Sequence, residues 1–296
     1  MNAKNNSLSD KVFNVVDCIL LFLFFLICIY PFYYVLIYSL STPSLANKGI
    51  TFLPAGFTFY NYACVFKLEG VFSAFVVSVL RTVIGTAITI VCCSLFAYLV
   101  SKRIMYFRKF IYRFLVVTMY FNSGLIPWYL AMKYYHLDNN FLLYVVPTAV
   151  SAYYIVLLKT FIEQLPPSLE ESAKLDGAGY LRIFWSIILP LSKPIVATIA
   201  VFSAVGQWNS WFDNYILVQN DSLNTLQLIL YNYLNQANTI ANSTSIEDKA
   251  RGIATVMTPQ SIRMTITMVV TLPIMLVYPF MQRYFVKGIM LGAVKG

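Results

Sequence analysis

Six long runs of apolar residues alternate with polar segments along this chain. They cover about residues 15–39, 71–100, 110–131, 141–160, 195–218 and 262–286. Each run is long enough to cross a hydrocarbon layer of about 30 Å as a helix that rises about 1.5 Å per residue. Backbone polar groups must satisfy each other in lipid, so helices are the expected form. The pattern predicts an all-α, polytopic membrane protein with six transmembrane helices between residues 15 and 286.

Lysine and arginine positions indicate the orientation of these helices. Fourteen of the 21 basic residues share one side if residues 1–14 are cytoplasmic, and they are densest in the short 101–113 loop. The other side and its span ends hold Lys48, Lys67, Arg81, Lys133, Lys249, Arg251 and Arg263. Cytoplasmic loops carry an excess of Lys and Arg. We therefore expect both termini, the 161–194 loop and the 287–296 tail to face the cytoplasm of a cell-membrane protein.

The composition supports a membrane protein and excludes several other classes. The chain is 59% hydrophobic and 11% charged, whereas a soluble domain has about 25% charged residues. The net charge of +9 does not indicate nucleic-acid binding, because no basic run lies in a soluble domain. The expected partner is the lipid bilayer. The five cysteines form no CxxC motif or His–Cys cluster, so neither a disulfide framework nor a metal site is expected.

The 161–194 loop is the most informative polar segment. Pro166 and Pro167 end the preceding element and predict a helix start. Glu170 and Glu171 then occupy the first turn, where the helix dipole favours anions. Gly177 and Gly179 end this helix, and Leu189-Pro190 marks the return to the membrane. A short acidic helix tied to two spans can transmit a push from a soluble partner, although a solvated amphipathic loop would show the same features.

The spacing in this loop resembles the EAA loop of ABC importer permeases. Glu171-Ser172-Ala173 is followed after three residues by Gly177, after nine more by Ile187, and then by Leu189-Pro190. Ser172 stands where that pattern usually has Ala. Three further segments resemble carbohydrate permeases of the maltose type, in the complex-oligosaccharide subgroup: Phe121 to Pro127, Trp208 to Phe212, and Met290 to Gly296.

The resemblance implies an ABC importer permease fold and a carbohydrate substrate, an oligosaccharide in this subgroup. It implies a heterodimer with a second permease, two ATPase subunits and an extracytoplasmic substrate-binding protein. The chain would be no enzyme and would hold no cofactor, because the ATPase binds ATP and magnesium; no GxxxxGK[ST] motif occurs here. The 166–179 helix would dock on the ATPase through Glu170, Glu171, Ser172, Ala173, Leu175, Asp176, Gly177 and Ala178. The tail would contact the ATPase through Gly292, Ala293, Val294, Lys295 and Gly296.

Span five carries the polar and aromatic residues expected of a sugar path. Trp208, Trp211 and Tyr215 have helical spacing and would share one face. Aromatic faces beside amide groups suit sugar rings and hydroxyls, and an acid in a span is a functional candidate by default. The candidate path residues are Trp208, Asn209, Trp211, Asp213, Asn214 and Asn122. Anchoring at the outer interface is the alternative, and in the maltose system the sugar site belongs mainly to the other permease.

Three other functions remain as alternatives. An ABC importer for a non-sugar solute would share the loop. An ion-coupled secondary transporter needs acids or broken helices at the membrane midplane, whereas the centres of these spans show almost no charge. A membrane-embedded enzyme would need a catalytic cluster, and none stands out.

Overall fold

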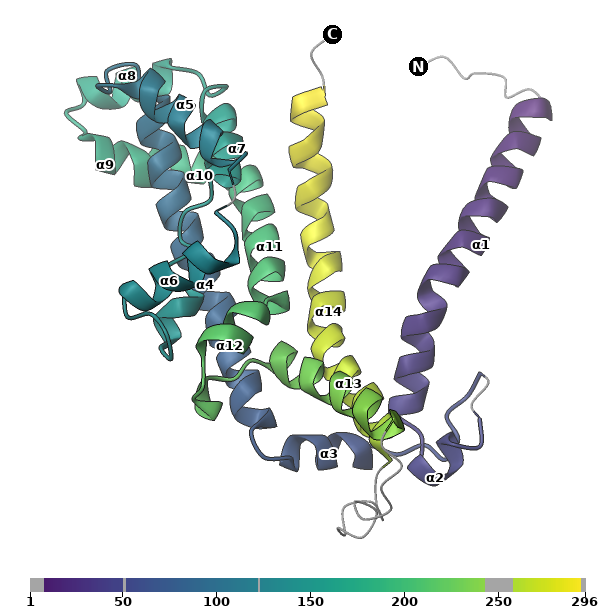
Figure 1. Ribbon diagram of the computed structural model, residues 1–296. Helices are drawn as coiled ribbons and strands as arrows, with labels where there is room; N and C mark the ends of the chain where they lie inside the picture. Colours follow the sequence, from purple (N-terminus) through teal and green to yellow (C-terminus); the bar gives the residue numbers. More distant parts are fainter. Residues whose placement is uncertain (1–7, 50–51, 122, 243–257, 294–296) are drawn as a thin grey trace. The chain divides into compact units, whose positions relative to one another are not determined.

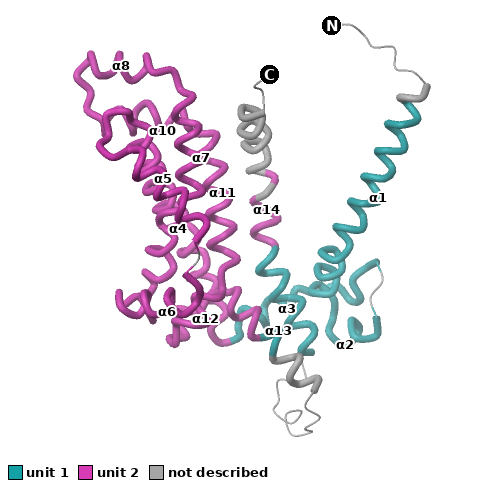
Figure 2. The backbone as a smooth tube through the Cα atoms, turned by 45° about the horizontal axis from the view of Figure 1, so that its top comes forward, with its two compact units in different colours: residues 1–68, 233–271 teal, residues 69–232, 272–296 magenta. Residues whose placement is uncertain are grey.

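The computed structural model describes residues 8–49, 52–121, 123–242 and 258–293, and every regular element in these ranges is a helix. The chain divides into two compact units (Figure 2). Unit 1 comprises residues 1–68 and 233–271, and unit 2 comprises residues 69–232 and 272–296.

Unit 1 is built around the end of its first long helix. Its complete helices are α1 (Leu8–Ser39), α2 (Pro43–Ala46) and α3 (Tyr60–Lys67). The buried Asn61 amide donates to the carbonyls of Ser39 and Ser41 at 2.8 Å each, which fixes α3 against the end of α1. The apolar side chains of α1 before this end are exposed, as expected of a helix that contacts lipid or another chain.

Unit 2 holds three helices that run side by side, α4 (Val71–Ser101), α7 (Ala152–Ile162) and α11 (Lys193–Asn209) (Figure 1). Its other complete elements are α5 (Arg108–Thr118), α6 (Leu125–Tyr134), η1 (Phe141–Tyr144), α8 (Ser168–Leu175), α9 (Tyr180–Ile183), the π-helical turn η2 (Phe184–Ile188), α10 (Leu189–Leu191), α12 (Phe212–Leu217) and η3 (Asp221–Leu223). Helices α13 (Leu226–Asn242) and α14 (Pro259–Ala293) pass from one unit into the other.

Three of the six apolar runs form continuous helices. Lys11–Ser39, Val71–Ser101 and Pro259–Val277 are each long and apolar enough to cross a membrane. A fourth span results if Tyr180–Leu191 and Lys193–Asn209, which meet at 82°, count as one bent element. The described residues therefore confirm an all-helical chain with three or four helices that could cross a membrane, while six spans remain a prediction.

The run at 110–131 is not one helix, contrary to the sequence pattern. Helix α5 ends at Thr118, and α6 begins only after Gly124, which has φ +79° and ψ 178°. That conformation is open only to glycine. Pro127 also disfavours a continuous helix, because its ring would clash with the carbonyl four residues earlier. In the first turn of α6 its missing N–H costs nothing.

The runs at 141–160 and 195–218 are broken as well. Pro147 lies between η1 and α7, and it removes a backbone donor where a continuous helix would need one. Helix α11 ends at Asn209, Ser210 is extended, and α12 begins at Phe212. The Asp213 side chain stabilises this second break through hydrogen bonds. Its carboxylate accepts from Ser210 Oγ at 3.2 Å and from the Asn214 N–H at 2.9 Å.

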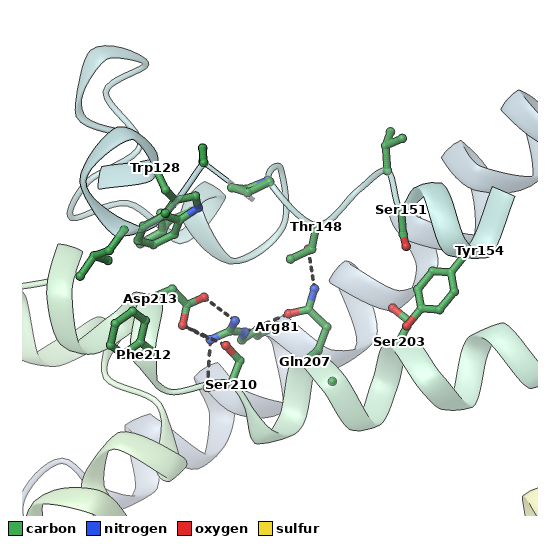
Figure 3. A pocket seen from close by; sticks show the side chains of 17 residues that line it. Arg81, Trp128, Thr148, Ser151, Tyr154, Ser203, Gln207, Ser210, Phe212 and Asp213 are labelled. Carbon is green, nitrogen blue, oxygen red and sulfur yellow. Dashed lines mark hydrogen bonds and ion pairs between the residues drawn. The ribbon is translucent and has the colours of Figure 1, made fainter. Parts of the chain in front are cut away.

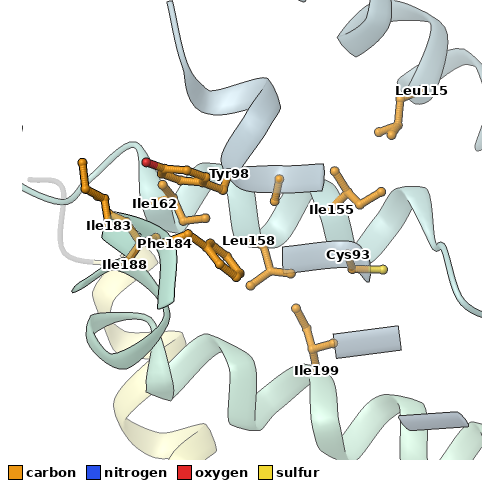
Figure 4. Close-up of a cluster of buried hydrophobic side chains, with 11 residues drawn as sticks. Cys93, Tyr98, Leu115, Ile155, Leu158, Ile162, Ile183, Phe184, Ile188 and Ile199 are labelled. Atoms are coloured by element: carbon orange, nitrogen blue, oxygen red, sulfur yellow. The ribbon is translucent and has the colours of Figure 1, made fainter. Parts of the chain in front are cut away.

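A hydrophobic cluster holds α4, α7, α9, η2 and α11 together (Figure 4). Ile155 and Ile199 are fully buried between the long helices, and Phe184 is fully buried against the Tyr98 ring at 5.5 Å between centroids. This packing connects the segment that follows α8 directly to α4 and α11.

Candidate functional site

Helix α8 lies with α9 at one end of unit 2, whereas α6 and α12 lie toward the other end (Figure 1). It begins after Pro166, with Pro167 as its N-cap, and carries Glu170 and Glu171 in its first turn. No side chain caps its first N–H groups, so these two carboxylates are favourably placed near the positive end of the helix dipole. The structure thus confirms the short acid-headed helix.

The two adjacent glutamates face different surroundings. Glu170 is 15% exposed and accepts from the Lys102 ammonium in an ion pair. The Lys102 nitrogen also lies 4.1 Å from the centroid of the Tyr98 ring, a cation–π contact. Burial lowers the pKa of Lys102, and the Glu170 carboxylate opposes that shift. Glu171 is exposed, and no cation within the described ranges pairs with it.

Helix α8 also has an inner and an outer face. Ala173 and Ala178 pack against the hydrophobic cluster that contains Tyr98 and Phe184. The outward residues of the predicted docking set are Glu171, Ser172, Leu175, Asp176 and Gly177, all exposed, with Leu175 at 90%. A groove of about 770 Å³ lies beside this helix, and its lining includes Lys102, Arg103, Pro166 and Pro167. The predicted coupling residues therefore split into an anchoring set and an accessible set.

Gly177 ends α8 in a Schellman motif. The N–H of Ala178 donates to the Ala173 carbonyl at 2.9 Å, and the N–H of Gly177 donates to the Lys174 carbonyl at 3.0 Å. Gly177 has φ +79°, the left-handed conformation that this motif needs. A Cβ at this position would meet no atom of the described residues within 4 Å, so the backbone angle is what requires glycine here.

We expect Gly177→Ala to loosen the end of α8. A left-handed conformation costs a residue with a Cβ about 1–2 kcal/mol, which corresponds to about a 5- to 30-fold change in a local opening equilibrium. Amide hydrogen exchange of residues 173–178 in the purified protein should speed up accordingly. The matched control is Gly179→Ala, because Gly179 has φ −72° and is equally free of close neighbours. Equal exchange in the two variants would contradict the role of the backbone angle.

A second candidate site is a cavity of about 750 Å³ in unit 2 (Figure 3). Its wall combines the aromatic side chains of Trp128, Tyr154 and Phe212 with hydroxyl and amide groups that include Ser151, Ser203 and Gln207. These residues come from α6, α7, α11 and α12, with Ser151 as the N-cap of α7, so the helix breaks described above bring them together. Aromatic faces beside neutral polar groups can bind a sugar ring.

Arg81 of α4 is the centre of a buried polar network at this cavity. Its side chain is 1% exposed and pairs with both carboxylate oxygens of Asp213, at 2.5 and 3.1 Å. Its Nε–H donates to Gln207 at 2.9 Å, its Nη1 donates to the Ser210 carbonyl at 3.2 Å, and its guanidinium lies 4.5 Å from the Tyr144 ring centroid. Gln207 in turn donates to Thr148 Oγ1 at 2.6 Å. The network fixes the break between α11 and α12 to α4, and it neutralises the arginine charge.

The structure places the predicted path residues in different surroundings. Trp208 does not share a helix face with Trp211 and Tyr215, because the helix is interrupted at Ser210. Trp211 and Tyr215 do lie together, with their ring centroids 5.9 Å apart. Trp208 is buried on α11 and contacts the Phe75 ring edge-on at 6.3 Å. Trp211 precedes α12 and stacks on Tyr231 at 4.1 Å between centroids.

Asn209 and Asn214 of the predicted path residues form hydrogen bonds within unit 2. Asn209 accepts from Gln227 at 3.1 Å, and the buried Asn214 accepts from the N–H of Thr225 at 2.7 Å. Of the predicted path residues, Asp213 lines the cavity. Asn122 lies outside the described residues. In the tail, Gly292 and Ala293 continue the backbone of α14, while Val294, Lys295 and Gly296 lie outside the described residues.

Sequence reasoning missed Arg81 as a site residue. We grouped it with the basic residues of the outer side and its span ends, and we described the span centres as almost free of charge. Arg81 is instead buried within α4 and paired. The available signal was an ionisable residue inside a long apolar run, with Asp213 as the matching acid in another run.

Comparison with known proteins places these features in a family context. A family model described as "Binding-protein-dependent transport system inner membrane component" matches residues 5–291. The polygalacturonan/rhamnogalacturonan transport system permease protein YtcP of Bacillus subtilis (strain 168) is 36% identical over 290 residues, which cover 98% of this chain and 100% of that protein. Protein LplC of the same organism is 34% identical over 297 residues, covering 100% of this chain and 99% of its own length.

A solved structure shows a similar fold. It is the crystal structure of a bacterial ABC transporter involved in the import of the acidic polysaccharide alginate. The match has a TM-score of 0.86 and 28% sequence identity, and it covers 96% of this chain and 100% of the matched chain.

Proposed function

Because the chain belongs to the family of binding-protein-dependent transport system inner membrane components, we propose that it is the permease subunit of an ABC importer for an oligosaccharide. The family consists of transport permeases and not of enzymes. The carbohydrate class comes from similar proteins, namely a polygalacturonan/rhamnogalacturonan transport system permease and a transporter involved in the import of alginate.

The observation that carries the mechanism is the anchored, exposed helix α8. Ala173 and Ala178 tie it to the hydrophobic cluster, while Glu171 and Leu175 face outward. A soluble ATPase that docks on this face can move α8, and the cluster passes that movement to α4 and α11. Alternating access then follows as a shift between two packings of the same helices.

The proposed complex has the partners of an ABC importer. A second permease completes the translocation path, two ATPase subunits bind ATP and magnesium, and an extracytoplasmic binding protein delivers the sugar. The tail from Gly292 to Gly296 is proposed to contact the ATPase. Within this chain, the path is proposed to pass the cavity that Asp213 lines. Trp208, Asn209, Trp211, Asn214 and Asn122 remain proposed path residues. The neutralised Arg81–Asp213 pair makes this part of the path suited to hydroxyl groups.

The proposed topology has six crossings with both termini in the cytoplasm of a cell-membrane protein. Helices α1, α4 and α14 cross as single helices. The α5–α6 and η1–α7 segments and the α11–α12 segment cross as broken helices, which membrane proteins tolerate where other protein groups cover the freed backbone groups.

Cysteine labelling tests this topology. In a variant without the five native cysteines, Ser222→Cys should react with an impermeant thiol reagent added outside intact cells, and Ser168→Cys should not. Both residues are exposed in the described structure, so burial does not explain a difference. Permeabilised cells provide the control, since both positions should then react. Labelling of Ser168→Cys alone in intact cells would reverse the proposed orientation.

Transport by the reconstituted complex tests the function itself. We expect proteoliposomes with both permeases, the ATPase and the binding protein to take up an oligosaccharide when ATP is present on the side of the membrane that carries the ATPase. A neutral oligosaccharide, an oligogalacturonate, an amino acid and an oligopeptide are compared as substrates. Uptake of the peptide or amino acid alone would favour the non-sugar importer. Uptake driven by an ion gradient without ATP would contradict an ABC importer.

A further inference from the structure

We propose that Glu170 is a positioning residue that joins the coupling helix α8 to the end of α4 through Lys102, so that of the two adjacent glutamates only Glu171 is free to contact the ATPase. This inference rests on the proposed function and assigns different tasks to two adjacent acids of the loop. It concerns which contact inside this chain carries the movement of α8 into the membrane-spanning helices.

The contacts form a continuous route from α8 into α4. Glu170 accepts from the Lys102 ammonium, and Lys102 is the C-cap of α4, where its N–H donates to the Leu99 carbonyl at 3.1 Å. The ammonium also rests on the Tyr98 ring at 4.1 Å. Tyr98 is 2% exposed in the hydrophobic cluster. A displacement of Glu170 therefore acts on a residue held at two points to the end of α4.

The same route extends along α4 to the second candidate site. Helix α4 is continuous from Val71 to Ser101, and Arg81 on it is paired with Asp213 beside the break before α12. Helix α8 is also tied to the membrane-spanning part by the cluster contacts of Ala173 and Ala178, and through the buried Phe184 in the segment that follows it. These contacts are apolar and not directional. The ion pair supplies the directional link, because it fixes one charged group against another.

The side chains of Glu170 and Glu171 differ in their exposure to solvent. The side chains of Glu170 and Lys102 are each 15% exposed, so solvent and salt screen their attraction less than they screen a surface pair. Glu171 is exposed and is not joined to any cation of the described ranges. A docking ATPase can reach Glu171 without breaking a contact inside this chain, whereas it would have to displace Lys102 to reach Glu170.

Charge reversal in the reconstituted transporter tests this assignment. The variants are Glu170→Lys, Lys102→Glu and the double exchange Lys102→Glu/Glu170→Lys. The measured quantities are ATPase copurification, binding-protein-stimulated ATP hydrolysis, and sugar taken up per ATP hydrolysed. We expect each single reversal to keep the ATPase bound and to lower uptake per ATP by about fivefold or more, the lower end of coupling effects between sites. The double exchange should recover most of the loss, because it restores an ion pair.

A charge reversal away from α8 is the control for these variants. Asp138→Lys reverses a charge in the exposed Lys133–Asp138 pair, far from α8 in the sequence, and should leave uptake per ATP unchanged. Unchanged coupling in both single variants would overturn the proposal, and so would a double exchange no better than the worse single variant. Loss of the ATPase from Glu170→Lys without recovery in the double exchange would assign Glu170 to the ATPase interface. Failure of the wild-type complex to couple ATP to uptake would instead refute the proposed function.

Discussion

Replacing Arg81 by alanine is expected to destabilise the protein by about 3–5 kcal/mol, because it leaves a buried carboxylate without its cation. Asp213 would lose both guanidinium hydrogen bonds, and Gln207 and the Ser210 carbonyl would each lose a donor. The break between α11 and α12 would then be held to α4 less firmly. The measurement is thermal unfolding of the purified protein in detergent, together with its amount in the membrane.

Two further variants test whether the loss of stability comes from the unpaired buried charge. Arg81→Met combined with Asp213→Leu should be less destabilising than Arg81→Ala, since no uncompensated charge stays buried. Lys133→Ala removes the cation of an exposed pair, with side chains 49% and 35% exposed and 4.0 Å apart, and should cost at most about 1 kcal/mol. An Arg81→Ala protein as stable as Lys133→Ala would contradict the role of the buried pair.

Reversing the charge of Glu171 is expected to abolish most transport. In the proposed complex this exposed carboxylate faces a basic residue of the ATPase, so Glu171→Lys brings like charges together, which costs several kcal/mol at an interface. A loss of about 1.4 kcal/mol already lowers affinity tenfold. We therefore expect at least about a tenfold drop in binding-protein-stimulated ATP hydrolysis and sugar uptake at limiting ATPase concentration. Insertion and folding should be retained, because Glu171 contacts no described cation of its own chain.

The control for this variant has the same charge change elsewhere. Glu69→Lys alters an exposed glutamate that precedes α4 and lies outside α8, so it should transport like the wild type. Excess ATPase should partly rescue Glu171→Lys, because the defect is one of docking. Normal stimulated hydrolysis and uptake in Glu171→Lys would refute the proposed docking role of α8.

The sequence pattern predicted the long helices well and the broken ones poorly. Helices α1, α4 and α14 follow from long apolar runs, because backbone polar groups in such runs have no alternative to a helix in lipid. Hydropathy averages over single residues, so it gave too little weight to Gly124, whose backbone angles no helix accommodates. Proline alone does not mark a break, because α1 continues through Pro31 and α14 through Pro273 and Pro279. The break at Ser210 has no such marker. It depends on Asp213 and on Arg81, which is distant in the sequence, and spacing along one segment does not reveal such a contact.

The candidate loop was predicted more fully than the candidate path. Helix α8, its acidic start and its glycine end depend on neighbours in sequence, and Pro167 and Gly177 act within one turn. The different tasks proposed for Glu170 and Glu171 depend on Lys102, which caps the end of another helix. The cavity is assembled from several helices, so its lining residues were not identifiable from span five alone.

The separation of Arg81 and Asp213 along the chain affects how the protein is made. They are 132 residues apart, and a ribosome adds about 5–20 residues per second, so Arg81 emerges roughly 7–26 s before its partner exists. An arginine at the centre of a lone helix costs about 2.5–3.5 kcal/mol on insertion, whereas each Leu, Ile, Phe or Val contributes about −0.3 to −0.6 kcal/mol. Helix α4 must therefore be apolar enough to enter the bilayer while its arginine is still unpaired. The order of synthesis therefore constrains the composition of α4, in addition to the contacts that α4 makes in the finished fold.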